Sequence, residues 1–425
     1  MNRKTPSAFS EKRRRFFRRA TAQIAFYRSL PATAALCLAI GLPACQEEVP
    51  MVSLGIDEEY YQPRMAALRL EPALTGEAYR WTLTTPEGKD SIVGTDRSYT
   101  FVQAEEGTYE LLFEILDPVN PYSHTTRIHV VHEETEYSPY ISEVCEYRPA
   151  PGQFVNLLPA YEEGDTEEDM RRKAEESIGG RNDVMVSLGG FGGYITFRFD
   201  HTVMNRPGAA DFAIYGNAFY ADADPTLSGG SAEPGIVMVA FDANCNGKAD
   251  PEEWYELAGS EYDSPDTRKR YRITYLRPQD GKPAVPAAGY IDTEHIAWHD
   301  NRDSCGYIAQ LIAHSQSYYP QWTDEDSLTF EGTLLPPNGT DVSGTGRYYV
   351  LRAYDWGYAD NKPNSDLENI SFDIDWAVDR DGNFVALPGV DFVRVYTGIH
   401  QQCGWIGETS TEITRAQDLN LPTEN

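Results

Sequence analysis

The chain has 425 residues, and its 66 acidic and 36 basic side chains give it a formal charge of −30 at pH 7. This excess of negative charge argues against a nucleic-acid-binding protein and against attachment to anionic lipids by charge. A chain of this length is long enough for two or three domains.

The first 44 residues are predicted to be a leader that is removed. A cluster of five arginines between residues 13 and 19 precedes an apolar run from Leu30 to Leu42, which is too short to span a membrane. The run ends in Leu-Pro-Ala-Cys45, which resembles the site where bacterial lipoproteins are cut before an acylated cysteine. We therefore expect Cys45 to carry a lipid anchor, with an ordinary secretory signal as the alternative. Gln46-Glu-Glu resembles the acidic export signal of Bacteroidetes lipoproteins and predicts an outer-membrane protein at the cell surface.

Two segments follow the leader. Residues 45–63 are acidic and irregular, and we expect them to be a tether. Residues 64–135 alternate apolar and polar residues in short runs between turns, which is the pattern of a small β-sandwich. Trp81 and the turn at Gly107-Thr-Tyr give this segment a resemblance to PKD-like, immunoglobulin-type modules of bacterial surface proteins. Such modules usually act as spacers.

Residues 136–425 are predicted to be one large antiparallel, jelly-roll-like β-sandwich with one short helix, so the chain as a whole is expected to be all-β. The helix is expected between Gly164 and Gly180, because Thr166 can cap its start and acidic residues fill its first turn. The continuous apolar run from Ile236 to Phe241 is expected to be a central strand buried on both faces.

The segment after this strand has the spacing of a calcium-binding loop. Counted from Asp242, oxygen-bearing side chains fall at positions 1, 3, 5, 9 and 12, and Gly247 takes position 6. A structural Ca²⁺ ion is therefore predicted, and a polar turn that binds no metal is the alternative. The candidate ligands are Asp242, Asn244, Asn246, the main-chain carbonyl of Lys248, Asp250 and either Glu252 or Glu253.

The sequence contains no recognisable constellation of catalytic residues. No Gly-x-Ser-x-Gly motif stands between a strand and a helix, so we predict no catalytic residue and do not expect an enzyme. The chain is rich in acidic residues, and a glycan hydrolase stays the weakest alternative. The possible pairings of four cysteines stay open, namely Cys145, Cys245, Cys305 and Cys403.

Aromatic residues gather at predicted strand ends and loops in the C-terminal half of the chain. Exposed aromatic rings stack on sugar rings and on flat cofactors, although aromatic residues also fill protein cores. The candidate ligand-binding residues are Tyr318, Tyr319, Trp322, Tyr354, Trp356, Tyr358 and Trp405.

Several segments together resemble a family of Bacteroidetes cell-surface lipoproteins with an N-terminal PKD-like module. These segments are Met185-Val-Ser-Leu-Gly-Gly-Phe-Gly-Gly-Tyr-Ile-Thr-Phe, Ile214-Tyr-Gly-Asn-Ala-Phe, Glu233-Pro-Gly-Ile-Val-Met-Val, Trp254-Tyr-Glu-Leu-Ala-Gly-Ser-Glu-Tyr, Gly357-Tyr-Ala-Asp-Asn, Asp375-Trp-Ala-Val-Asp and Gly404-Trp-Ile-Gly-Glu-Thr-Ser-Thr-Glu. The resemblance implies no catalytic residues. Genes of this family can lie near corrinoid-uptake genes, which suggests capture of vitamin B12-type cofactors.

These observations lead to one main hypothesis and one alternative. The chain is expected to be a surface-exposed, lipid-anchored protein that captures a corrinoid or a glycan through a calcium-stabilised β-sandwich. The alternative is a structural or adhesive surface protein whose partner is a host or bacterial protein.

Overall fold

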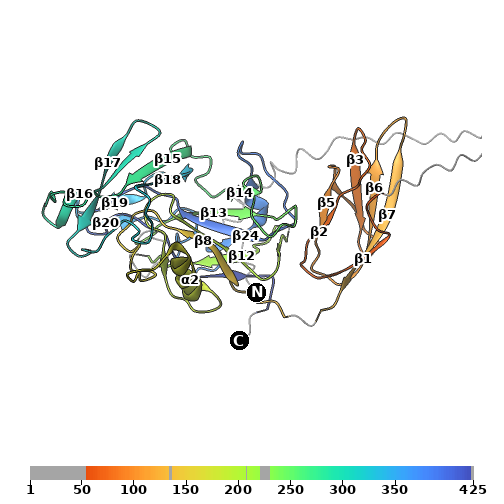
Figure 1. Cartoon of the computed structure of the whole chain (residues 1–425), viewed down its shortest axis with the longest axis horizontal. Helices are drawn as coiled ribbons and strands as arrows, with labels where there is room; N and C mark the ends of the chain where they lie inside the picture. The colour runs from red at the N-terminus through yellow and green to blue at the C-terminus, as the bar shows by residue number, and fades with distance from the viewer. Residues whose placement is uncertain (1–53, 134–135, 207, 221–229, 423–425) are drawn as a thin grey trace, which may run out of the picture. The chain divides into compact units, whose positions relative to one another are not determined.

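A computed structural model describes residues 54–133, 136–206, 208–220 and 230–422 (Figure 1). The described residues are nearly all β, with one α-helix and several antiparallel sheets, so the predicted fold class is confirmed. The leader and Cys45 lie outside the described residues. No helix in the described part of the chain is long and apolar enough to cross a membrane.

The first strands form a small β-sandwich, as the alternating pattern predicts. One sheet has the order β1-β7-β6-β3-β4, from β1 (Glu59–Pro63), β3 (Tyr79–Thr84), β4 (Asp90–Gly94), β6 (Gly107–Ile115) and β7 (Tyr122–Val131). The other pairs β2 (Leu68–Leu70) with β5 (Tyr99–Phe101). Trp81 is fully buried between them, with its ring centroid 4.6 Å from that of Phe113 and 5.7 Å from that of Tyr99. The tryptophan that marked this module in the sequence is therefore its core residue.

The prediction that residues 45–63 form an irregular tether is wrong for the last five of these residues. Glu59–Pro63 is strand β1, which pairs in parallel with β7 from Arg127 to Val131. Its side chains are mostly exposed, so the segment lacks the apolar alternation that predicts a strand. Main-chain pairing with β7 and the stacking of Tyr61 on His129 at 4.6 Å hold it in the sheet instead.

Helix α2 (Glu167–Ile178) forms where it was predicted. The Thr166 side chain accepts a hydrogen bond from the Asp169 amide, and the Asp169 carboxylate accepts one from the Thr166 amide, so the start of the helix has a complete capping box. The helix ends at Gly179, and its buried face consists of Met170, Ala174 and Ile178.

Removing this cap is expected to loosen the helix. Replacing Thr166 with alanine should cost about 1 kcal/mol of helix stability, because the Asp169 amide loses its acceptor. Hydrogen exchange should show faster exchange of the first-turn amides of α2. T166S keeps the hydroxyl and is expected to exchange like the wild type, so equal exchange in T166A and T166S would contradict this account.

The rest of the described chain is built on two larger sheets. The six-stranded sheet has the order β22-β14-β13-β24-β10-β8, from β8 (Glu143–Arg148), β10 (Tyr194–Arg198), β13 (Gly235–Ala240), β14 (Trp254–Leu257), β22 (Ala377–Val378) and β24 (Phe392–Thr397). The four-stranded sheet has the order β17-β16-β15-β18, from β15 (Arg268–Leu276), β16 (Tyr290–Asp300), β17 (Cys305–Leu311) and β18 (Ser327–Leu334). The predicted central strand is β13, and it is buried almost throughout.

Short strand pairs and one turn of 3₁₀ helix complete this part. They are β9 (Val186–Ser187) with β25 (Glu412–Ile413), β11 (Val203–Met204) with β23 (Gly389–Val390), β12 (Phe212–Tyr215) with both β21 (Ser371–Phe372) and β26 (Arg415–Asp418), β19 (Gly339–Asp341) with β20 (Tyr349–Leu351), and η3 (Ile374–Trp376). Cys145, Cys245, Cys305 and Cys403 are all free thiols.

The main core lies between the two larger sheets. Phe191 packs edge to face on Tyr271 of β15 at 5.2 Å and on Tyr396 of β24 at 6.3 Å, so it joins both layers. Tight glycine turns before and after Phe191 direct its ring into the core. A Cβ atom at Gly189 would lie 1.9 Å from the Ala150 carbonyl oxygen, so only glycine fits there. The Gly-Gly-Phe-Gly-Gly segment thus serves to insert one aromatic ring into the core.

Candidate functional site

The predicted calcium loop connects strands β13 and β14, which pair in antiparallel fashion on either side of it. The Asp242 carboxylate accepts hydrogen bonds from the amides of Asn246 at 3.0 Å and Gly247 at 2.7 Å. Gly247 has a φ of +76°, a conformation that favours glycine. Position 1 of the loop is therefore folded over positions 5 and 6, as in a loop that wraps one ion.

The oxygen-bearing side chains of this loop converge. The Asp250 carboxylate accepts hydrogen bonds from the side-chain amides of Asn244 at 2.7 Å and Asn246 at 2.9 Å. Burial, together with the charges of Asp242 and Asp250, raises the pKa of Glu253. Carboxylate and amide oxygens are the ligands that Ca²⁺ prefers. In this structure the two asparagines present their amide nitrogens to Asp250, and their side-chain oxygens accept hydrogen bonds from the main-chain amides of Asn246 and Lys248. The residue types of the loop therefore suit a calcium ion, whereas the carboxylates of Asp242, Asp250 and Glu253 are not among the described acidic groups whose ligand atoms all lie within 4.8 Å of one another.

The structure distinguishes the two candidates for the closing ligand. Glu253 turns into the loop, where its carboxylate accepts hydrogen bonds from the amides of Ala243 at 3.0 Å and Asp250 at 3.1 Å. Glu252 is exposed, and so is Lys248, whose amide donates to the Asn246 side chain. Glu253 is thus the acidic residue placed to close the loop.

Most of the predicted ligand-binding aromatics belong to the interior. Tyr318, Tyr319, Trp356 and Tyr358 are at most 6% exposed, so their predicted role in stacking on a ligand at the surface is wrong. The physical reason is that the loops of this protein pack back against the sheets, so that their large side chains are buried. Tyr354 is half-buried, and its hydroxyl donates to the Pro336 carbonyl oxygen.

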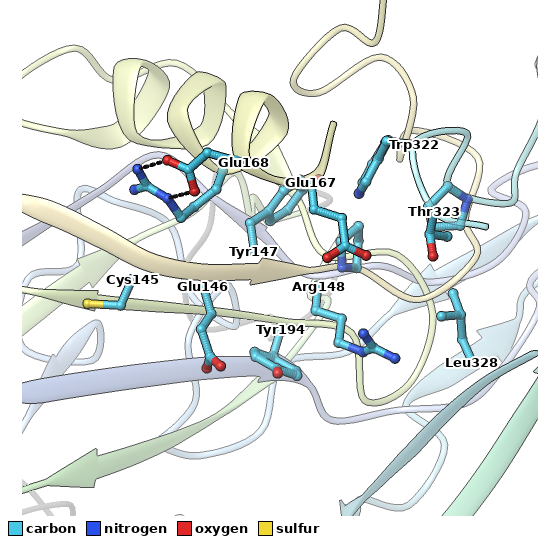
Figure 2. A pocket seen from close by; sticks show the side chains of 13 residues that line it. Cys145, Glu146, Tyr147, Arg148, Glu167, Glu168, Tyr194, Trp322, Thr323 and Leu328 are labelled. Carbon is cyan, nitrogen blue, oxygen red and sulfur yellow. Dashed lines mark hydrogen bonds and ion pairs between the residues drawn. The ribbon is translucent and has the colours of Figure 1, made fainter. Parts of the chain in front are cut away.

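Trp322 and Trp405 remain accessible but are not brought together. Trp405 is 69% exposed and lines neither of the two cavities described for this chain. Trp322 is half-buried and lines a cavity of about 350 Å³ beside the start of α2 (Figure 2). Tyr147 and Tyr161 flank its ring at centroid distances of 6.0 Å and 6.3 Å, so the indole is held in place.

Charged and polar side chains complete the cavity beside Trp322, which we call the Trp322 cavity. Figure 2 shows the Glu167 carboxylate, from the start of α2, and the Arg148 guanidinium, from the end of β8, on the side of the cavity nearest Trp322. The Arg148 guanidinium lies 2.9 Å from the carboxylate of Glu325. The hydroxyl-bearing ring of Tyr194 lies on the neighbouring strand β10, and burial raises its pKa, so the phenol is neutral at neutral pH. An aromatic face, a fixed cation and exposed carboxylates therefore share one open cavity.

Sequence reasoning missed a buried group of three carboxyl side chains, Glu233, Asp360 and Glu412, which we call the carboxyl trio. Their nearest oxygen atoms all lie within 4.8 Å of one another. The Asp360 carboxyl accepts hydrogen bonds from the amides of Asn217 at 2.7 Å, Ala218 at 2.8 Å and Glu412 at 3.0 Å. The trio thus brings together the segments around residues 217, 233, 360 and 412.

Without a bound cation, the three carboxyl groups of the trio cannot all be ionised at the same time. Burial and the Glu412 charge raise the pKa of Asp360 to about 8, and burial raises that of Glu412 to about 7. The pKa of Glu233 is raised well above its usual value, again chiefly by burial. Three buried carboxyl groups at this spacing need either shared protons or a divalent cation. A sequence signal existed, because all three residues lie in the segments that carry the family resemblance.

Comparisons with known proteins identify no family for this chain. No protein-family model matches it, and no curated protein does. Among solved structures it is similar to SusE-like protein BT2857, with a TM-score of 0.26 and 10% identity, covering 84% of this chain and 94% of that chain. It is also similar to a structure of carbohydrate-binding modules from the β-sandwich superfamily, with a TM-score of 0.13 and 8% identity, covering 85% and 94% of the two chains. TM-scores this low establish neither a shared family nor a shared ligand.

Proposed function

We propose that this protein is a lipid-anchored, surface-exposed binding protein that captures a glycan in the Trp322 cavity. The observation that carries this proposal is the half-buried Trp322 ring, flanked by two tyrosines, on an open cavity that also holds Arg148 and Glu167. Sugar rings present an apolar face that stacks on an indole, and hydroxyl groups that bond to charged side chains. This one cavity therefore offers both an indole face for stacking and charged side chains for hydrogen bonding.

The size of the cavity favours a sugar over a corrinoid. Its volume of about 350 Å³ lies at the small end of the range of roughly 300–1,000 Å³ for ligand pockets. One or two sugar rings fit such a space, whereas a corrin ring with its side chains needs much more. The surface location rests on the leader and on the Cys45 motif, which are sequence features.

We propose further that calcium stabilises the sandwich that presents this cavity. The loop begins where the central strand β13 ends and closes where β14 begins, so a bound ion would tie two neighbouring strands together. The carboxylates of Asp242, Asp250 and Glu253 would hold the ion, and Asn244 and Asn246 would add their side-chain oxygens after their amide groups turn around, because in this structure the amide nitrogens face Asp250. Calcium would act here as a structural ion.

A glycan microarray probed with the purified protein tests the proposed function. The wild type is expected to bind a defined subset of glycans. Replacing Trp322 with alanine should weaken that binding by about 2 kcal/mol, or roughly thirtyfold, because the stacking surface is lost. W405A removes a tryptophan that is 69% exposed and lies outside the Trp322 cavity, so it serves as the matched control.

Three results would contradict the proposal. The wild type could bind no glycan, W322A could bind as well as the wild type, or W405A could lose binding while W322A keeps it. Including a corrinoid such as cyanocobalamin in the same assay tests the other predicted ligand class, and tight corrinoid binding that W322A abolishes would replace the glycan assignment.

A further inference from the structure

A second cavity, of about 340 Å³, opens at the four-stranded sheet. We call it the Glu408 cavity. Strand β16 contributes Trp298, β17 contributes Ile308, and the tight turn before β10 contributes Phe191. The remaining wall comes from the segment between β24 and β25, including His400 and Glu408. None of the residues that line it lines the Trp322 cavity, so the two cavities are separate sites.

One wall of this cavity is aromatic. Trp298 pairs across the strands with Gly306, and a Cβ atom on Gly306 would lie 2.7 Å from the indole. Glycine at this position therefore lets the ring lie against the neighbouring strand. The His400 imidazole stands perpendicular to the indole at a centroid distance of 4.6 Å. Burial lowers the pKa of His400 to about 4, so its ring is neutral at neutral pH and offers one acceptor nitrogen.

Glu408 provides a carboxyl group with one unused oxygen. Its side chain is 3% exposed, and its Oε1 atom accepts a hydrogen bond from the Gln153 amide at 2.9 Å. Its Oε2 atom is buried without a hydrogen-bond partner among the described residues. Buried polar atoms are nearly always paired in proteins, and an unpaired one is costly. The unpaired oxygen therefore indicates a missing hydrogen-bond partner.

The charge around this carboxyl group points to a positively charged donor. Of the described residues that line the cavity, none is a lysine or an arginine. Glu412 of the carboxyl trio adds negative charge nearby and, after burial, helps to raise the pKa of Glu408. A ligand that supplied both a donor and a positive charge would satisfy the free oxygen and stabilise the ionised carboxylate.

We propose that the Glu408 cavity binds a small organic ligand with a primary ammonium group, which donates to the free oxygen of Glu408 and lies against Trp298. A primary ammonium has three donors, and Glu408 and the neutral His400 ring supply acceptors for two of them. The indole face attracts the positive charge in addition. This site goes beyond the proposed glycan binding and does not depend on it, because the two cavities share no residue.

A pair of probes that differ in one group tests this proposal. Cyclohexylammonium and cyclohexanol have the same ring and nearly the same size, but only the first carries a charge and three donors. Titrated into the purified wild-type protein and followed by calorimetry, cyclohexylammonium is expected to bind at least tenfold more tightly than cyclohexanol. The comparison uses the unmodified protein, so it does not depend on the folding of a variant.

Two variants test whether the preference for cyclohexylammonium over cyclohexanol arises in the Glu408 cavity. E408Q keeps the shape of the side chain but removes its charge, and it should lower the affinity for cyclohexylammonium at least tenfold while leaving that for cyclohexanol unchanged. W322A should leave both affinities unchanged, which separates this site from the glycan cavity. Melting curves check that both variants are folded. Equal affinities of the wild type for the two probes, no binding of cyclohexylammonium, or an unchanged preference in folded E408Q would each overturn the proposal.

Discussion

Removing calcium is expected to lower the melting temperature of the protein by on the order of 8 °C. A ligand that binds only the folded state stabilises it by mass action, by about 4 kcal/mol when its free concentration is a thousand times its Kd. The ion would join the end of β13 to the start of β14, two neighbouring strands inside the six-stranded sheet. Melting curves in excess calcium and in excess chelator measure the difference.

Two neighbouring glutamates provide a matched control for this prediction. Glu253 accepts hydrogen bonds from two loop amides, whereas Glu252 is exposed to solvent. E253Q should therefore lose most of the calcium-dependent stabilisation, and E252Q should keep it. Identical melting curves of the wild type with calcium and with chelator would contradict the calcium assignment. A calcium effect that E252Q abolishes and E253Q preserves would contradict the assignment of the closing ligand.

Replacing Glu412 with glutamine is expected to stabilise the protein at about pH 8 by on the order of 3 kcal/mol. In the folded wild type, burial raises the pKa of Glu412 to about 7 and, with the Glu412 charge, that of Asp360 to about 8. In the unfolded chain both groups ionise near pH 4. Between about pH 4 and pH 8 the folded state therefore binds more protons, and the stability of the wild type falls as pH rises.

Glutamine removes the Glu412 contribution to this fall, so the advantage of E412Q should shrink as the pH is lowered and disappear at about pH 4, where Glu412 is protonated in both the folded and the unfolded chain. Chemical denaturation of both proteins at several pH values, in the presence of chelator, measures this difference. Ser187 and Ser410 donate hydrogen bonds to the Glu412 carboxyl, and the glutamine carbonyl oxygen can accept them in its place. An E412Q protein that is less stable than the wild type at pH 8 would show that the trio is ionised and neutralised in another way.

Local signals in the sequence predicted local structure well. The start of α2 depends on Thr166 and on the acidic residues of its first turn, which the sequence analysis used to predict the helix, and the structure has both. Strand β13 was predicted from a continuous apolar run, and it lies inside the six-stranded sheet. In both cases the residues that determine the structure are neighbours in the chain, so their spacing is informative.

Long-range arrangement was harder to predict. Aromatic residues in loops have the same appearance in the sequence whether they face a ligand or the core, and Tyr318 and Tyr358 belong to the core. Trp322 differs from them because Tyr147 and Tyr161, far away in the sequence, hold its ring beside a cavity. Such partners become visible only when the sheets are assembled.

The buried acidic groups were equally hard to predict, because they too depend on contacts between distant parts of the chain. Glu233, Asp360 and Glu412 lie more than fifty residues apart from one another in the sequence, and the chain is so rich in acidic residues that none of them stands out. Their segments all belong to the family resemblance, but nothing in the spacing of the three residues indicates that they meet. Glu408 is likewise identified by an unpaired oxygen atom, which is a property of the fold alone.

The most direct test of the proposed function is to follow the indole N–H signals of the tryptophans by NMR while a glycan from the microarray is added. The account predicts that the signal of Trp322, assigned from the spectrum of W322F, shifts in a saturable manner while that of the exposed Trp405 stays in place. A saturable shift of Trp405 or Trp298 with an unchanged Trp322 signal would contradict it.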